Sequence, residues 1–266
     1  MSANNDSIKK TLLVAILLCL VCSVIVAGAA VSLKPMQQIN KAKDKKENIL
    51  AAAGILQPGV SIEEQFKQIT TRIVNLQEGR FATDEELAEI KAAGLDPQNY
   101  DQVKAAKKAQ LSRTLSNEED KASIKRLVKY AAVYIVKAPD GGIGTMILPV
   151  HGYGLWSTLY GFLALQGDME TIVGLGFYSH AETPGLGGEV DNPKWKALWH
   201  GKKLHDAQGN LAISVIKGGA EEGNLNQVDG LSGATLTSRG VNNLVRFWVG
   251  DMGFGKFLTH LKEQGA

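Results

Sequence analysis

The stretch "YAAVYIVKAPDGGIGTMILPVHGYGLW", residues 130–156, decides the fold of this chain. Two apolar segments flank the turn sequence Asp140-Gly141-Gly142. Short apolar runs separated by glycine-rich turns predict a strand, a turn and a second strand. Further strands are predicted in "TIVGLGFYSH" (171–180) and "LAISVIKGG" (211–219).

A helix is expected after these strands, in "GVNNLVRFWVGDM" (240–252). Its apolar residues recur with helical spacing and share one face: Val241, Leu244, Val245 and Trp248. Strands grouped before a closing helix predict an α+β domain with a mainly antiparallel sheet and flanking helices.

The N-terminal part contains an uncharged apolar run, "TLLVAILLCLVCSVIVAGAAVSL", residues 11–33. As a helix it would span roughly 34 Å, enough for a single transmembrane helix. The small residues of "VAGAAVSL" leave a cleaved signal peptide as the alternative, but the run is longer than a usual signal core. More lysines follow the run than precede it, yet long domains translocate largely regardless of charge, so the sequence leaves the membrane side open.

The chain therefore divides into a short tail (1–10), a transmembrane helix (11–33), a helical connecting or insert region (34–128) and a C-terminal domain (129–266). Within the connecting region we expect a helix over 36–54 that ends at Gly54. A second helix begins at Ser61, with Glu64 as its capping-box partner. A third, within 82–96, ends at Gly94.

Composition excludes several functions. Apolar residues make up 44% of the chain and charged residues 21%, as in a globular protein. The net charge of +2 does not favour nucleic-acid binding. Cys19 and Cys22 lie inside the apolar run, and the five histidines lack metal-ligand spacing, so no metal site is expected. No GxSxG hydrolase motif occurs, and the glycine pairs lack a dinucleotide-binding context.

Two segments could carry a ligand. In "HAETPGLGGEVDNPKW" (180–195), three glycines let the main chain approach a flat ligand, and Glu182 and Thr183 supply polar edges; an ordinary surface loop is the alternative. In "VDGLSGATLTSRGV" (228–241), Asp229 and Ser232 could simply cap the following helix. A helix N-terminus also favours an anion, and a threonine between small residues there could hold a phosphate.

This second segment resembles the flavinylation motif D-G-x-(S/T)-G-A-T of the FMN-binding domain family, and "ETPGLGG" is similar to that family's second signature. In the family, a flavin transferase joins FMN to the motif threonine through a phosphoester. The resemblance implies one covalent FMN per chain. The matching positions are Asp229, Gly230, Ser232, Gly233, Ala234 and, as acceptor, Thr235. Thr237 is a second hydroxyl that physical reasoning from the sequence does not exclude.

The same resemblance implies contacts to the flavin ring from Glu182, Thr183 and Leu186, with Trp156 and Lys217 as further candidates. Trp156 could pack on the ring, and Lys217 could stabilise negative charge on reduced flavin. A core position for Trp156 and a solvated strand end for Lys217 are the alternatives.

Nearly the whole chain, including "ENILAAAGI" and "HGYGLWSTLYGF", resembles the C-subunit family of Na⁺-translocating NADH:quinone reductases. The resemblance implies an electron-relay subunit of a complex that oxidises NADH, reduces ubiquinone and pumps Na⁺. Other subunits of the complex and a flavin transferase would be its partners. The chain would lie in a bacterial inner membrane with its soluble domain in the periplasm.

Two alternatives differ in function. The G subunits of Rnf-type ferredoxin–NAD complexes share both signatures and the anchor, but the long region before Lys129 argues against them. A non-redox anchored protein, in which "SGAT" only caps a helix, would be colourless.

Overall fold

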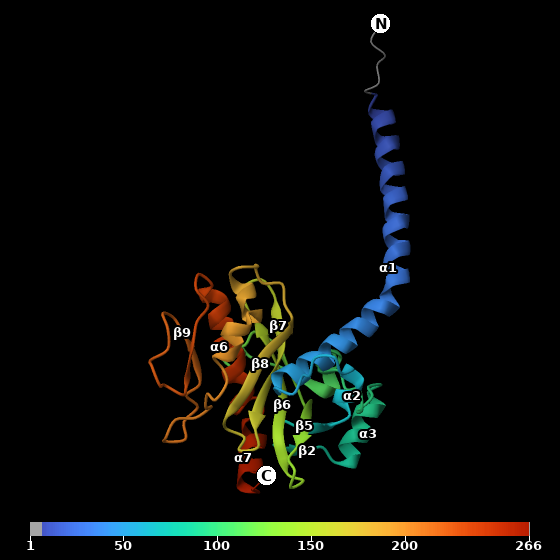
Figure 1. Ribbon diagram of the computed structural model, residues 1–266. Coiled ribbons are helices and arrows are strands. Elements are labelled where there is room, and N and C mark those ends of the chain that lie inside the picture. Colours follow the sequence, from blue (N-terminus) through green and yellow to red (C-terminus); the bar gives the residue numbers. More distant parts are fainter. Residues whose placement is uncertain (1–6, 266) are drawn as a thin grey trace. The chain divides into compact units, whose positions relative to one another are not determined.

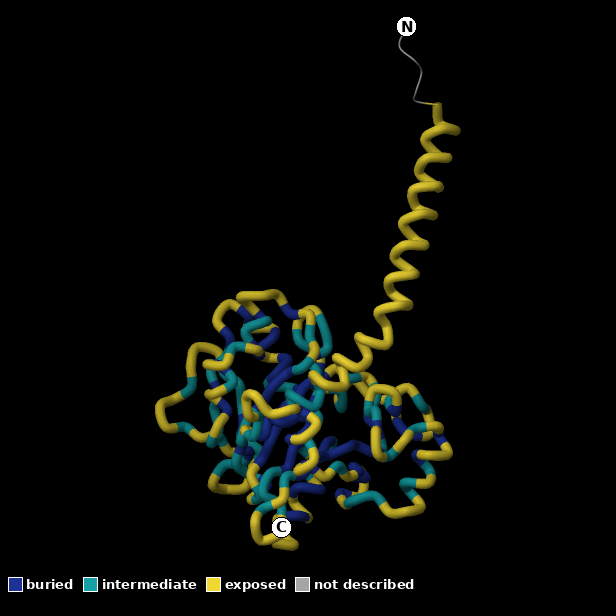
Figure 2. The backbone as a smooth tube through the Cα atoms, turned by 45° about the vertical axis from the view of Figure 1, so that its right-hand side comes forward, coloured by how far each residue is buried: buried dark blue, intermediate teal, exposed yellow. Residues whose placement is uncertain are grey.

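The computed structural model describes residues 7–265, and its chain divides into two compact units, Met1–Lys45 and Lys46–Ala266. The first unit is built on helix α1 (Ile8–Ala52), whose residues 8–44 are all exposed (Figures 1 and 2). By length and composition α1 is able to cross a membrane. The helix expected over 36–54 is present as the C-terminal part of α1, which continues through Pro35 at the loss of one helical hydrogen bond and ends just before Gly54.

The second unit is organised by a six-stranded sheet in the order β2-β1-β5-β6-β7-β8 (Figure 1). Every neighbouring pair is antiparallel. The strands are β1 (Ile69–Asn75), β2 (Arg80–Phe81), β5 (Tyr130–Lys137), β6 (Ile143–Tyr153), β7 (Thr158–Gln166) and β8 (Ile172–Ser179). The turn at Asp140-Gly141-Gly142 joins β5 to β6, and Gly141 adopts φ +90° there. The predicted α+β class with a mainly antiparallel sheet is confirmed.

The connecting region over residues 34–128 was expected to be helical, but it contains strand β1. All seven of its residues pair with β5, so this region supplies a strand of the main sheet. The sequence "ITTRIVN" is rich in β-branched residues, which favour a strand once a partner edge is present. The domain boundary at residue 129 stays a prediction.

Short elements surround β1 and β2. Ser61 caps helix α2 as expected, and Thr83 forms a capping box with Glu86. Gly94 follows the third helix with φ +75°, which confirms its predicted end. These elements are α2 (Ile62–Phe66), α3 (Asp84–Ala92), α4 (Gln102–Ala106), η1 (Ala109–Leu111), β3 (Ser112–Thr114) and β4 (Arg126–Val128).

Helix α6 (Thr235–Val249) packs against β6 and buries the face formed by Val241, Leu244, Val245 and Trp248, as predicted. The Trp248 indole donates a hydrogen bond of 2.7 Å to the His151 carbonyl. The chain closes with α7 (Gly255–Glu263). Between β8 and α6 lie η2 (Gly187–Asp191), α5 (Pro193–Ala197), β9 (Ser214–Ile216) and β10 (Gln227–Asp229). Of the strand predicted over 211–219, only Ser214–Ile216 forms, in parallel with β10.

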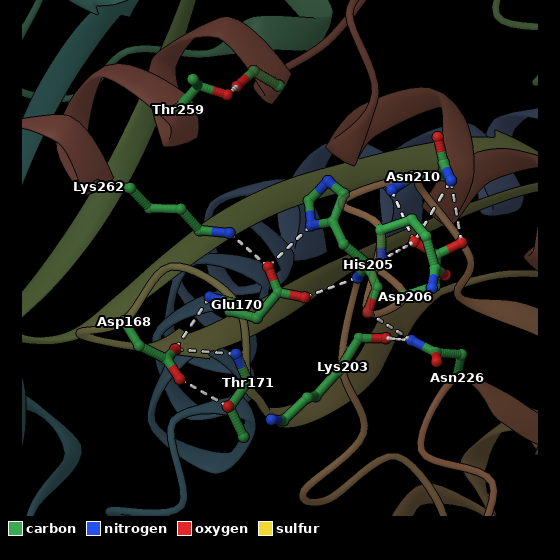
Figure 3. A network of polar contacts seen from close by, with 12 residues as sticks. Asp168, Glu170, Thr171, Lys203, His205, Asp206, Asn210, Asn226, Thr259 and Lys262 are labelled. Carbon is green, nitrogen blue, oxygen red and sulfur yellow. Dashed lines mark hydrogen bonds and ion pairs between the residues drawn. The ribbon is translucent and has the colours of Figure 1, made fainter.

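A network of polar contacts fixes the turn after β7 (Figure 3). Glu170 accepts hydrogen bonds from the backbone N–H of His205 at 2.6 Å, from the His205 ring at 2.7 Å and from Lys262 of α7. Burial alone raises the pKa of Glu170, but these hydrogen bonds outweigh it and hold the pKa below its ordinary value. An ionised carboxylate therefore joins the sheet, the loop before β9 and the last helix.

Candidate functional site

Thr235, the first residue of α6, lies exposed on the wall of a cavity of about 680 Å³. Ligand sites for small molecules commonly enclose about 300–1,000 Å³. The cavity is lined by Val215, Lys217, Gly218, Gly219, Asp229, Gly230, Leu231, Ser232, Gly233, Thr235, Ser238, Arg239 and Asn242. It therefore brings together most of the motif over 229–235 with the loop after β9.

The motif is held by contacts that leave the helix N-terminus free. The Asp229 carboxylate accepts the Ala220 amide at 2.5 Å, and its carbonyl accepts the Trp195 indole at 2.8 Å. Ser238 accepts the Leu231 amide at 2.8 Å. The residue at the N-cap position is Ala234, and it makes no side-chain cap hydrogen bond. The alternative in which Asp229 and Ser232 only cap the helix is wrong, since the Asp229 carboxylate binds the Ala220 amide and the N-cap residue of the helix is Ala234.

Uncapped amides in the first turn of a helix are strong anion ligands, because their N–H groups have no intrahelical acceptor and the helix dipole adds positive potential. Beside them, Gly218 and Gly219 adopt φ +93° and +104°, and an added Cβ at Gly218 would meet no atom within 4 Å. The cavity thus combines an anion-binding end with a stretch of wall at Gly218-Gly219 that carries no side chains. These features fit a ligand that carries a phosphate.

Glu182 begins the 182–188 loop and is only 5% exposed. Its carboxylate accepts the backbone amides of Leu155, Trp156 and Ser157 at 3.0–3.3 Å and the Thr237 hydroxyl at 2.7 Å. Burial alone raises the pKa of Glu182, but these donors outweigh it and hold the pKa below the ordinary range. One ionised carboxylate therefore joins the turn before β7, the 182–188 loop and α6. The ring contact expected of Glu182 stays a prediction.

The two candidate acceptor hydroxyls have opposite environments. Thr237 is 1% exposed, and its hydroxyl is committed to Glu182. Thr235 is exposed and faces the cavity. Of the two threonines, Thr235 is therefore the one accessible to an enzyme that modifies the motif.

Three of the other predicted ring contacts, Thr183, Leu186 and Trp156, lie outside the lining of the cavity. Thr183 is exposed, Leu186 is 45% exposed and Trp156 is 64% exposed, so a core position for Trp156 is wrong. Leu186 touches the motif, because its Cδ2 atom lies 3.2 Å from where a Cβ on Gly233 would be. Gly233 itself adopts φ +71°, which a side chain would strain. Leu186 and Trp156 are thus exposed apolar side chains, and Leu186 lies next to the motif at Gly233.

Lys217 is exposed directly after β9 and lines the cavity. Lys217 is thus a solvated residue at a strand end, as one interpretation had it, and it also lies in the cavity. Its contact with the flavin ring stays a prediction. Sequence reasoning missed Arg239 and Asn242. The signal for Arg239 was its helical spacing of four residues from Thr235, but it required knowing that the helix begins at Thr235 and not near Gly240.

The class of protein follows from a family comparison. The model of the FMN-binding domain family matches residues 154–250, which span the Trp156 turn, the 182–188 loop, the cavity and α6. The chain is thus similar to flavin-binding proteins over the segment that forms the site.

Full-length relatives narrow this class. The C subunit of the Na⁺-translocating NADH-quinone reductase of Pseudomonas aeruginosa is 54% identical, covering 99% of this chain and all of that one. The C subunit of the Yersinia pestis reductase is 47% identical over 98% of this chain and 95% of its own. This chain belongs to the family of C subunits of Na⁺-translocating NADH-quinone reductases. These full-length matches favour the C-subunit assignment over the alternative of an Rnf-type G subunit.

Solved structures of C subunits are also similar to this chain. The crystal structure of Shewanella oneidensis NqrC is 34% identical with a TM-score of 0.72, covering 83% of this chain and 98% of that one. The C-subunit structure from Parabacteroides distasonis is 28% identical with a TM-score of 0.64, covering 85% and 97%.

Proposed function

We propose that this chain relays electrons through an FMN joined covalently to Thr235, as a membrane-anchored subunit of a Na⁺-pumping NADH:ubiquinone oxidoreductase. The observation that carries the proposal is the exposed Thr235 hydroxyl at an uncapped helix N-terminus, on the wall of a cavity of about 680 Å³. That threonine lies within the segment matched by the FMN-binding domain family.

Each part of the site has a role in this proposal. The first-turn amides of α6 stabilise the negative charge of the phosphodiester. Thr183, Leu186 and Trp156 offer the ring an exposed surface, and Glu182 holds the loop that carries two of them. The bound FMN supplies the capacity to accept and pass on electrons. A covalent tether keeps it in place through repeated transfers, so the chain relays electrons and the other subunits bind NADH and quinone.

The test is the mass of the full-length chain produced together with its flavin transferase. We expect the addition of one phosphoester-linked FMN in the unaltered chain and in Thr237→Ser, and no addition in Thr235→Ala. Trypsin releases residues 218–239 as one peptide containing both threonines, so fragmentation of that peptide must locate the adduct. A colourless, unmodified chain under these conditions would leave the non-redox alternative standing.

The anchor and its side are tested separately. If α1 spans the inner membrane, the chain stays in the membrane fraction after alkaline carbonate washing, whereas a variant starting after residue 33 is released. If the Lys46–Ala266 unit is periplasmic, protease added to spheroplasts digests it without lysis. Digestion only after lysis would place the unit in the cytoplasm. Co-purification of the remaining reductase subunits tests the proposed partners.

A further inference from the structure

Arg239 lies one helical turn after Thr235 and lines the same cavity. Residues four apart share a helix face, with about 5–6 Å between their Cβ atoms. An arginine side chain at that position is long enough to reach the space in front of the threonine hydroxyl. The helix that presents the proposed acceptor therefore also presents a cation to it.

The charge of Arg239 is not used by the fold. The side chain is exposed, and within residues 7–265 it makes no hydrogen bond or ion pair. A second arginine of α6, Arg246, is bound by the fold: it donates hydrogen bonds to the carbonyls of Ile213 and Leu211 at 2.8 and 3.1 Å. Arg246 supports the structure, whereas Arg239 is available to a ligand.

Lys217 is the second cation of the cavity, and its side chain is likewise exposed and has no partner among the described residues. One acidic residue lines the cavity, Asp229, and its Oδ1 atom is bonded to the Ala220 amide. The two positive charges of Lys217 and Arg239 and the one negative charge of Asp229 give the lining a net charge of +1. The cavity is therefore suited to an anion beside Thr235.

We infer that Arg239 binds the phosphodiester that joins FMN to Thr235, with Lys217 as the second cation. The inference rests on the proposed function. A phosphodiester keeps two unesterified oxygens, and the planar guanidinium can donate to both at once, which a single ammonium group does less well. Arg239 thus binds the linkage itself, while the ring contacts come from other segments.

The experiment follows flavinylation of the purified full-length chain by its transferase, measured as the initial rate of mass gain in the 218–239 region. We expect Arg239→Gln to slow the reaction about tenfold or more, because a charge-assisted hydrogen bond is lost. Arg239→Lys keeps the charge but loses the paired donors of the guanidinium, so we expect its rate to lie between those of Arg239→Gln and the unaltered chain. Lys203→Gln is the matched control, since Lys203 is an exposed lysine outside the cavity. Thermal unfolding of each variant verifies that it folds.

A second readout separates binding of the phosphate from binding of the transferase. After prolonged modification, the ³¹P resonance of the flavinylated chain should shift in Arg239→Gln and stay unchanged in Lys203→Gln. A folded Arg239→Gln chain that gains no flavin at all, while Arg239→Lys does, supports the inference. Modification of Arg239→Gln at the unaltered rate overturns it, as does a slower rate with an unmoved ³¹P resonance. An unaltered chain that gains no flavin contradicts the proposed function instead.

Discussion

The hydrogen bond between Thr237 and Glu182 should contribute substantially to the stability of the Lys46–Ala266 unit. The hydroxyl donates 2.7 Å to an ionised carboxylate, and both side chains are at most 5% exposed. A hydrogen bond to a charged group contributes about 1.5–3 kcal/mol. Valine has nearly the shape of threonine, so Thr237→Val removes the donor without creating a cavity. We expect it to lower the free energy of unfolding by about 2 kcal/mol.

A double-mutant cycle isolates this contact. Glu182→Gln removes the charge, but its amide N–H can still donate to the Thr237 hydroxyl, so the combination with Thr237→Val measures the part of the coupling that depends on the charge. We expect this part to be about 1 kcal/mol. Urea unfolding of the full-length chain in detergent can be followed by tryptophan fluorescence, because all four tryptophans lie in Lys46–Ala266.

The pH dependence provides an internal check. The pKa of Glu182 is held below its ordinary value, so its contribution to stability is complete above the unfolded-state pKa of about 4.3 and is lost as pH falls through the lower folded-state pKa. Thr237→Val should weaken this acid sensitivity. A coupling below about 0.5 kcal/mol, with an unchanged acid limb, would refute the reasoning that the pair joins the loop to α6.

Three further predictions concern the scaffold. Burial lowers the pKa of His151 to about 4, so NMR should find its ring neutral from pH 8 to 5. The contribution of the neutral ring to stability is complete above the unfolded-state pKa of about 6.5, and it is lost as the pH falls toward 4. Gly240→Ala would put a Cβ 2.5 Å from the Tyr153 carbonyl oxygen and should cost about 1–3 kcal/mol of unfolding free energy, whereas Gly176→Ala, with no atom within 4 Å, should cost less. Glu170→Gln should lower stability at pH 7 by about 1–2 kcal/mol in urea unfolding and flatten the loss below the unfolded-state pKa, since its folded pKa is lowered; an unaltered acid limb would contradict this.

The sequence predicted local features well where neighbouring residues determine them. The glycine turn after β5, the Ser61 cap and the end of the third helix at Gly94 are set by short-range sterics and hydrogen bonds. The strand β1 was missed, because "ITTRIVN" becomes a strand through pairing with β5, more than fifty residues away along the chain.

The site shows the same division. By itself, the sequence determined that a small, glycine-flanked motif precedes an amphipathic helix, and that a second glycine-rich signature lies upstream. The family motif pointed to Thr235 as the acceptor, but physical reasoning from the sequence did not choose between Thr235 and Thr237. The tertiary structure gives the two threonines opposite environments: α6 begins at Thr235, and residues two apart on a helix are rotated by about 200°, so Thr235 lines the cavity while the Thr237 hydroxyl turns inward to Glu182. The physical reason is that burial depends on the packing of segments distant in sequence, which short-range patterns do not encode.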